Sequence, residues 1–89
     1  STQTVRWYHY RSPNCDYLLI WLRLGDVSQS AAQITGQAGT GTAQTISAYY
    51  QAMGAGTVQR QMLLPWGATD SGYQEVTLTI AYAGIQDVM

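Results

Sequence analysis

His9 and Cys15 are the only histidine and the only cysteine in the chain, and together they are its one conceivable nucleophile and base pair. A catalytic thiol must be activated by the imidazole, and oxyanion-stabilising donors must lie beside it. Asp16 directly follows Cys15, and its negative charge disfavours the thiolate. No part of the sequence supplies the donors. We therefore expect a turn cysteine and a strand histidine that do not meet, and no enzyme.

The acidic residues are scattered singly along the chain, each beside an expected turn or strand end. They are Asp16, Asp26, Asp70, Glu75 and Asp87. Carboxylates at such places commonly accept backbone hydrogen bonds. Two carboxylates could still meet in space as they do in glycosidases, although no other pattern supports such a pair. One histidine and one cysteine also fall short of a metal-ligand set, so we predict no metal and no cofactor.

Residues 36–41 read Gly-Gln-Ala-Gly-Thr-Gly, a glycine-rich segment. Such segments cradle phosphate when they open a helix after a strand and carry a lysine. This segment lacks the lysine and that context. A flexible hairpin connection between two strands is the simpler interpretation.

Aromatic and arginine side chains crowd the first quarter of the chain and suggest a binding surface. If Arg6, Tyr8 and Tyr10 share one exposed face, they form a platform on which a sugar ring, a nucleobase or a partner side chain could stack. Trp66, in an expected loop, is the fourth candidate. The alternative is that these rings fill the core of a protein that has no phenylalanine.

Composition narrows the function classes. Only 10% of the 89 residues are charged and the formal net charge is −1, so no overall field attracts nucleic acid or an anionic membrane. The longest apolar run, residues 17–22, is too short to span a bilayer, and no basic-then-apolar leader opens the chain. We expect a soluble domain with a weak preference for an extracellular, surface or virion setting.

Alternating residues predict four strands near the two ends of the chain. They cover residues 5–10, 17–24, 58–64 and 75–82. The second is apolar on nearly both faces, which predicts a place in the middle of a sheet or between two layers. Residues 65–72 are rich in turn formers, so we expect the last two strands to form an antiparallel hairpin.

The centre of the chain fits two templates. Residues 42–51 alternate as a strand, whereas Thr42 as N-cap, the spacing of Ile46, Tyr50 and Met53, and Gly54 as a stop fit a helix over 42–53. Residues 26–36 have a weaker form of this ambiguity. Strands are favoured by the Thr, Ile and Tyr content and by glycines at 36, 39 and 41, spaced as in hairpins.

The predicted fold is therefore mainly β: one domain over residues 1–89, a small antiparallel sandwich or barrel of about six strands, with an α+β fold as the alternative. A free edge is expected at the strand that carries Val76, Leu78, Ile80 and Tyr82, because no lysine or proline discourages pairing there.

These features favour a non-catalytic interaction or assembly module, such as a subunit of a surface or virion structure. Its expected partner is a second copy or another protein, reached through strand edges and aromatic surfaces. A carbohydrate-binding module with a Tyr/Trp platform is one alternative. A small nucleic-acid-binding domain is the other, and the charge balance counts against it.

Overall fold

The computed structural model describes residues 2–25, 31–49 and 57–83, and these residues form strands and connecting loops without a helix. The strands are β1 (Thr2–Arg11), β2 (Tyr17–Gly25), β3 (Ala31–Ala38), β4 (Gln44–Tyr49), β5 (Thr57–Pro65) and β6 (Gly72–Ala83). The prediction of a mainly β fold is confirmed. No helix able to cross a membrane is present in the described ranges.

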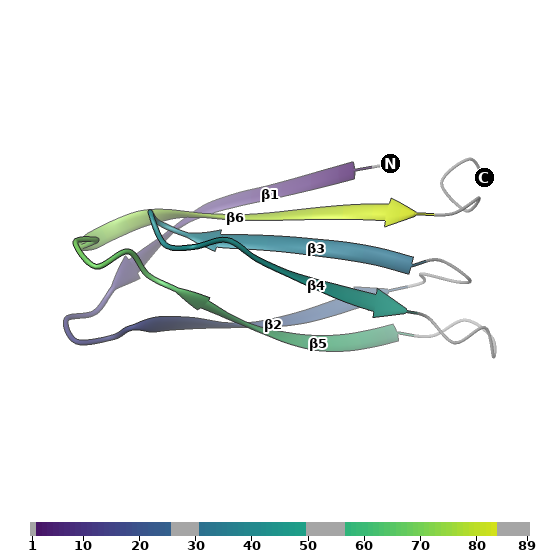
Figure 1. Cartoon of the computed structure of the whole chain (residues 1–89), viewed down its shortest axis with the longest axis horizontal. Helices are drawn as coiled ribbons and strands as arrows, with labels where there is room; N and C mark the ends of the chain where they lie inside the picture. The colour runs from purple at the N-terminus through teal and green to yellow at the C-terminus, as the bar shows by residue number, and fades with distance from the viewer. Residues whose placement is uncertain (1, 26–30, 50–56, 84–89) are drawn as a thin grey trace.

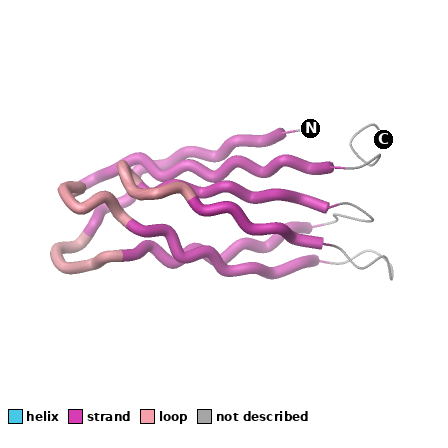
Figure 2. The backbone as a smooth tube through the Cα atoms, in the orientation of Figure 1, coloured by secondary structure: helices cyan, strands magenta, loops and turns pink. Residues whose placement is uncertain are grey.

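The strands form two antiparallel sheets. The four-stranded sheet has the order β1-β6-β3-β4, and the two-stranded sheet pairs β2 with β5. Figures 1 and 2 show the strands running along the long axis of the molecule, with the 12–16, 39–43 and 66–71 loops gathered at one end. The N-terminal end of β1 lies at the opposite end, beside the end of β6, where Thr2 is in register with Ala81.

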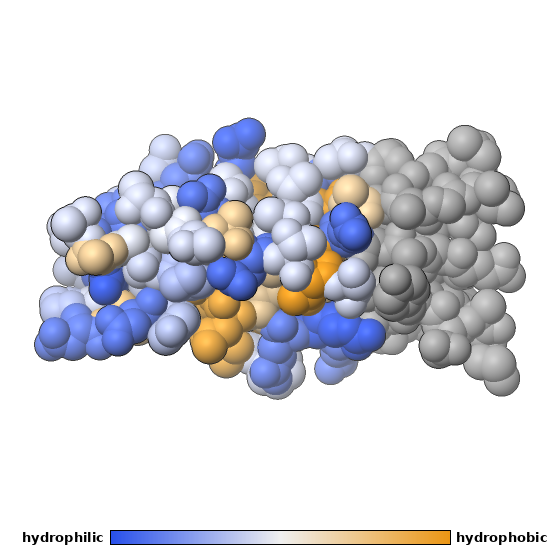
Figure 3. Space-filling model, in the orientation of Figure 1, coloured by the Kyte–Doolittle hydropathy of each residue, from blue (hydrophilic) through white to orange (hydrophobic). Residues whose placement is uncertain are grey.

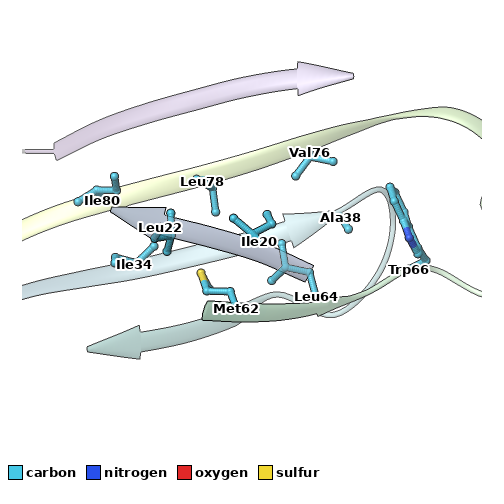
Figure 4. Packing of buried hydrophobic residues seen from close by; sticks show 10 residues of the cluster. All are labelled: Ile20, Leu22, Ile34, Ala38, Met62, Leu64, Trp66, Val76, Leu78 and Ile80. Atoms are coloured by element: carbon cyan, nitrogen blue, oxygen red, sulfur yellow. The ribbon is translucent and has the colours of Figure 1, made fainter. Parts of the chain in front are cut away.

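The core lies between the sheets and is built by the alternation that the sequence displays. The buried apolar side chains come from β2, β3, β5, β6 and the loop after β5. They are Ile20, Leu22, Ile34, Ala38, Met62, Leu64, Trp66, Val76, Leu78 and Ile80. Figure 4 shows these side chains pointing into the space between the two sheets. Trp7, Leu18 and Ile46 pack at the margin of this cluster.

The central region, whose sequence fits both a strand and a helix, is extended over β3 and β4. β3 and β4 form a hairpin in which Ile34 is in register with Ile46 and Thr35 with Thr45. The helix considered for 42–53 is therefore wrong over β4, and residues 26–30 and 50–56 lie outside the described ranges. Gly36 does not end a strand, because it lies inside β3. A Cβ added at this position would come within 3.0 Å of side-chain carbons of Leu64 and Leu78.

Two predictions about strand pairing are wrong. β5 and β6 do not form a hairpin, since β5 pairs with β2 while β6 pairs with β1 and β3. The strand of Val76, Leu78, Ile80 and Tyr82 is not a free edge either, because β6 lies between two hydrogen-bonded neighbours. In the described sheets, β1 and β4 are the edges of the larger one and β2 and β5 those of the smaller one.

The expected position of β2 also needs correction. Ile20 and Leu22 are buried, as one apolar face requires. The second apolar face, with Leu19 and Trp21, is exposed rather than covered by another layer. Two-sided apolar character is typical of a doubly covered strand, and here it marks a strand whose outer face is an apolar surface.

Candidate interaction surfaces

Asp70 ties together two loops at the end of the sandwich. Its Oδ2 accepts hydrogen bonds from Thr40 N at 2.9 Å and Gly67 N at 2.8 Å, and its Oδ1 accepts one from Thr40 Oγ1 at 2.8 Å. The pKa of Asp70 lies below its ordinary value of 3.8, chiefly because the Thr40 N–H stabilises the ionised carboxylate. Partial burial opposes this shift, while the Thr40 hydroxyl, the Gly67 N–H and the charge of Arg11 add to it.

Arg11 holds the neighbouring 12–16 turn in place at the same end of the sandwich. Its Nη1 donates to Gly67 O at 2.6 Å and to Asp70 O at 3.0 Å, and its Nε donates to Cys15 O at 2.9 Å. The guanidinium is largely buried, and its Nη2 lies 3.8 Å from Asp16 Oδ1. Arg11 therefore links the 12–16 turn to the 66–71 loop through hydrogen bonds.

Asp70→Asn is expected to lower the urea midpoint of unfolding, because a neutral amide oxygen accepts the N–H groups of Thr40 and Gly67 less strongly than the ionised carboxylate, and the NH2 group replaces the oxygen that accepts from the Thr40 hydroxyl. Since the folded pKa is depressed, the carboxylate contributes stability above about pH 4 that is lost as the pH falls through the folded pKa. Urea unfolding at pH 7 and pH 2.5 measures this. The loss should be large at pH 7 and smaller at pH 2.5.

Asp16→Asn is the matched control, because the Asp16 carboxylate is 82% exposed and its contact with Arg11 is long. It should leave the midpoint nearly unchanged at both pH values. A pH-independent loss for Asp70→Asn, or an equal loss for Asp16→Asn, would contradict the assigned role.

The outer face of the four-stranded sheet carries three of the four predicted platform residues. Arg6, Tyr8 and Tyr10 alternate with the inward-facing residues of β1, and Tyr8 is 69% exposed. Tyr73 of β6 joins them: it is in register with Tyr10, is 72% exposed, and meets Tyr10 edge-on with ring centroids 5.2 Å apart. Tyr73 lies before the expected start of this strand at residue 75 and was therefore not predicted for the platform, although it continues the alternation of the polar face.

The fourth predicted residue, Trp66, lies elsewhere. It is buried in the core at 7% exposure, 6.3 Å from the His9 ring, and its N donates to Asp16 O at 2.9 Å. Trp66 is therefore not part of an exposed platform, because the loop folds it under the end of the sandwich. Cys15 is exposed, with its Sγ 3.3 Å from Tyr17 O.

The outer face of the two-stranded sheet carries a row of exposed apolar side chains. Leu19 and Leu63 are in register on adjacent strands and are 50% and 55% exposed, and Trp21 beside them is 67% exposed. Tyr17 extends this row, which we call the apolar face: Tyr17, Leu19, Trp21 and Leu63. In Figure 3 hydrophilic and neutral residues cover most of the visible described surface, and one of the apolar patches lies toward the lower edge, where Figure 1 draws β5.

No family model, curated protein or solved structure matches this chain. The geometry of the two outer faces is therefore the basis for a functional proposal. Within the described ranges no group of three or more His, Cys, Asp or Glu side chains is placed to hold a metal ion.

Proposed function

We propose that this protein is a non-catalytic β-rich assembly module that associates with a second copy of itself through the apolar face, as a subunit of a surface or virion structure would. The observation that carries the proposal is the exposure of Leu19, Trp21 and Leu63 on one side of a two-stranded sheet. Large apolar side chains gathered on the surface of a small domain are typical of association sites.

The charges along β2 favour a dimer in which the β2 strands of the two copies run in opposite directions. Arg23 follows Trp21 on the apolar face, and the exposed carboxylate of Asp16 lies before Tyr17 at the other end of the strand. A two-fold axis running across the strands sets each Arg23 beside the partner's Tyr17 and Asp16. The same operation sets Trp21 against Leu19 of the second copy. A shallow hollow beside Trp21, lined by Gln59, Arg60 and Gln61, gives the partner's side chains a place to enter.

The size of the apolar face sets the expected affinity. Four large side chains, each half or more exposed, form a patch on the order of 400 Å². Two such patches with their polar rims bury about 1,200 Å² in total, which is the lower limit for specific interfaces. A dissociation constant in the micromolar range or weaker is therefore expected, roughly 10 µM to 1 mM.

Trp21→Ser is expected to weaken self-association by at least about thirtyfold, since a central tryptophan of an interface is worth ~2 kcal/mol or more. Analytical ultracentrifugation over a wide concentration series measures the effect. Leu63→Ser should act in the same direction, because Leu63 is in register with Leu19 on the adjacent strand and is exposed on the same face.

The control is Tyr8→Ser, which changes an equally exposed aromatic on the opposite face and should leave the dissociation constant unchanged. A wild-type protein that stays monomeric at the highest attainable concentration would refute the proposal. So would dimers that Trp21→Ser and Leu63→Ser leave intact.

A further inference from the structure

We infer that the outer face of the four-stranded sheet is a second binding site, a strip that takes an uncharged oligosaccharide by stacking sugar rings on Tyr8 and Tyr73. The residues of this tyrosine strip are Arg6, Tyr8, Tyr10, Tyr73 and Glu75. The strip faces away from the apolar face, so this inference does not rest on the proposed self-association.

Two rings of the strip restrain each other before any ligand arrives. Tyr10 and Tyr73 meet with their planes at 72°, an edge-on contact that restrains both side chains. Tyr8 is in register with Glu75, so it is a diagonal neighbour of Tyr73 on the same face. Because the contact with Tyr10 already restrains Tyr73, less conformational entropy is lost when a ligand stacks on this ring. Two neighbouring exposed rings suit two consecutive sugars of one chain.

Hydrogen-bonding groups for sugar hydroxyls lie directly beside the rings. Arg6 Nη1 and Glu75 Oε1 are 4.0 Å apart, and their side chains are 64% and 45% exposed. This separation is longer than a hydrogen bond, so donors of the guanidinium and lone pairs of the carboxylate stay free for a ligand. Planar groups of this kind pair with two neighbouring hydroxyls at once.

The charge balance of the strip selects among ligands. Arg6 and Glu75 are its two charged groups, and they cancel each other. A phosphate, sulfate or uronate would need an excess of positive charge, which this face does not offer in its described part. The ligand that matches a neutral face of rings and hydroxyl groups is an uncharged sugar chain.

The sheet continues the strip with hydroxyl groups. Thr4, Thr79, Thr35 and Thr45 follow one another across the four strands in register. Thr35 Oγ1 and Thr45 Oγ1 are 2.9 Å apart and share a hydrogen bond, which confirms that these side chains lie on one face. A row of threonines suits a longer sugar chain that is held by hydrogen bonds.

The test is a titration of the isotope-labelled full chain with cellohexaose and hexa-N-acetylchitohexaose, which are uncharged, and with hyaluronan hexasaccharide, which is acidic. Amide shifts in β1 and β6 report binding to the strip. We expect saturable binding of an uncharged hexasaccharide. Tyr8→Ala and Tyr73→Ala should each weaken it about tenfold, since each removes one stacking contact. Tyr17→Ala is the matched control, because Tyr17 is exposed on the other face, and it should bind like the wild type.

Three outcomes would overturn the inference: no saturable binding of either uncharged sugar, binding of the acidic sugar alone, or equal weakening by Tyr17→Ala. Ultracentrifugation of the same samples measures self-association independently of sugar binding, so the two proposals are tested separately. Loss of self-association in Leu63→Ser with sugar binding retained supports both proposals, because it is the result expected of two independent sites. Sugar binding by a wild type that is always monomeric refutes only the assembly function, and self-association without sugar binding refutes only the strip.

Discussion

Gly41→Ala is expected to destabilise the fold by at least ~3 kcal/mol, a large share of the stability of a domain this small. Gly41 is buried in the loop between β3 and β4. A Cβ at this position would overlap the carbonyl oxygen of Pro65 and lie 3.0 Å from the carbonyl carbon of Trp66. Both contacts are with backbone, so no side chain can rotate away. Urea unfolding followed by far-ultraviolet dichroism measures the loss.

Gly72→Ala is the control for the conformational part of this effect. Gly72 has φ +70°, which disfavours alanine, but no heavy atom lies within 4 Å of the added Cβ. It should cost only about 1–2 kcal/mol, the strain of a left-handed alanine. Gly41→Ala with a smaller loss than Gly72→Ala would show that the two loops are not packed as described.

Leu64→Ala is expected to cost about 3 kcal/mol, because Leu64 is fully buried and its removal leaves a cavity beside Gly36 and Leu78. Leu63→Ala, one residue away on the same strand, should cost less than about 1 kcal/mol, since Leu63 faces solvent. The same unfolding experiment compares the two. Similar losses would contradict the inward and outward assignment of β5, on which the apolar face depends.

The alternation of side chains predicts the strands well, because burial of one face is a local property of each segment. Val76, Leu78 and Ile80 alternate with polar residues in the sequence, and the structure buries these three side chains. Pairing could not be predicted in the same way, since it depends on contacts between segments far apart in the chain. The turn formers after Pro65 are compatible with a hairpin, yet here they carry the chain from one sheet to the other.

The candidate surfaces were predicted in part, for a related reason. Arg6, Tyr8 and Tyr10 share a face because two-residue alternation fixes it. The sequence does not tell whether an apolar residue on the second face of a strand is covered by another layer. Trp21 and Leu19 therefore suggested burial although they are exposed, and Trp66 suggested exposure although the core encloses it.

The place of β6 in the four-stranded sheet bears on how the protein is made. β6 is the last of the six strands to leave the ribosome, yet it is the strand that joins β1 to β3. Until β6 emerges, β1 has no strand to pair with in this sheet, and β3 of the β3–β4 hairpin is paired on one side only. Assembly of this sheet therefore waits for β6, because β1 and the β3–β4 hairpin are joined only through that strand.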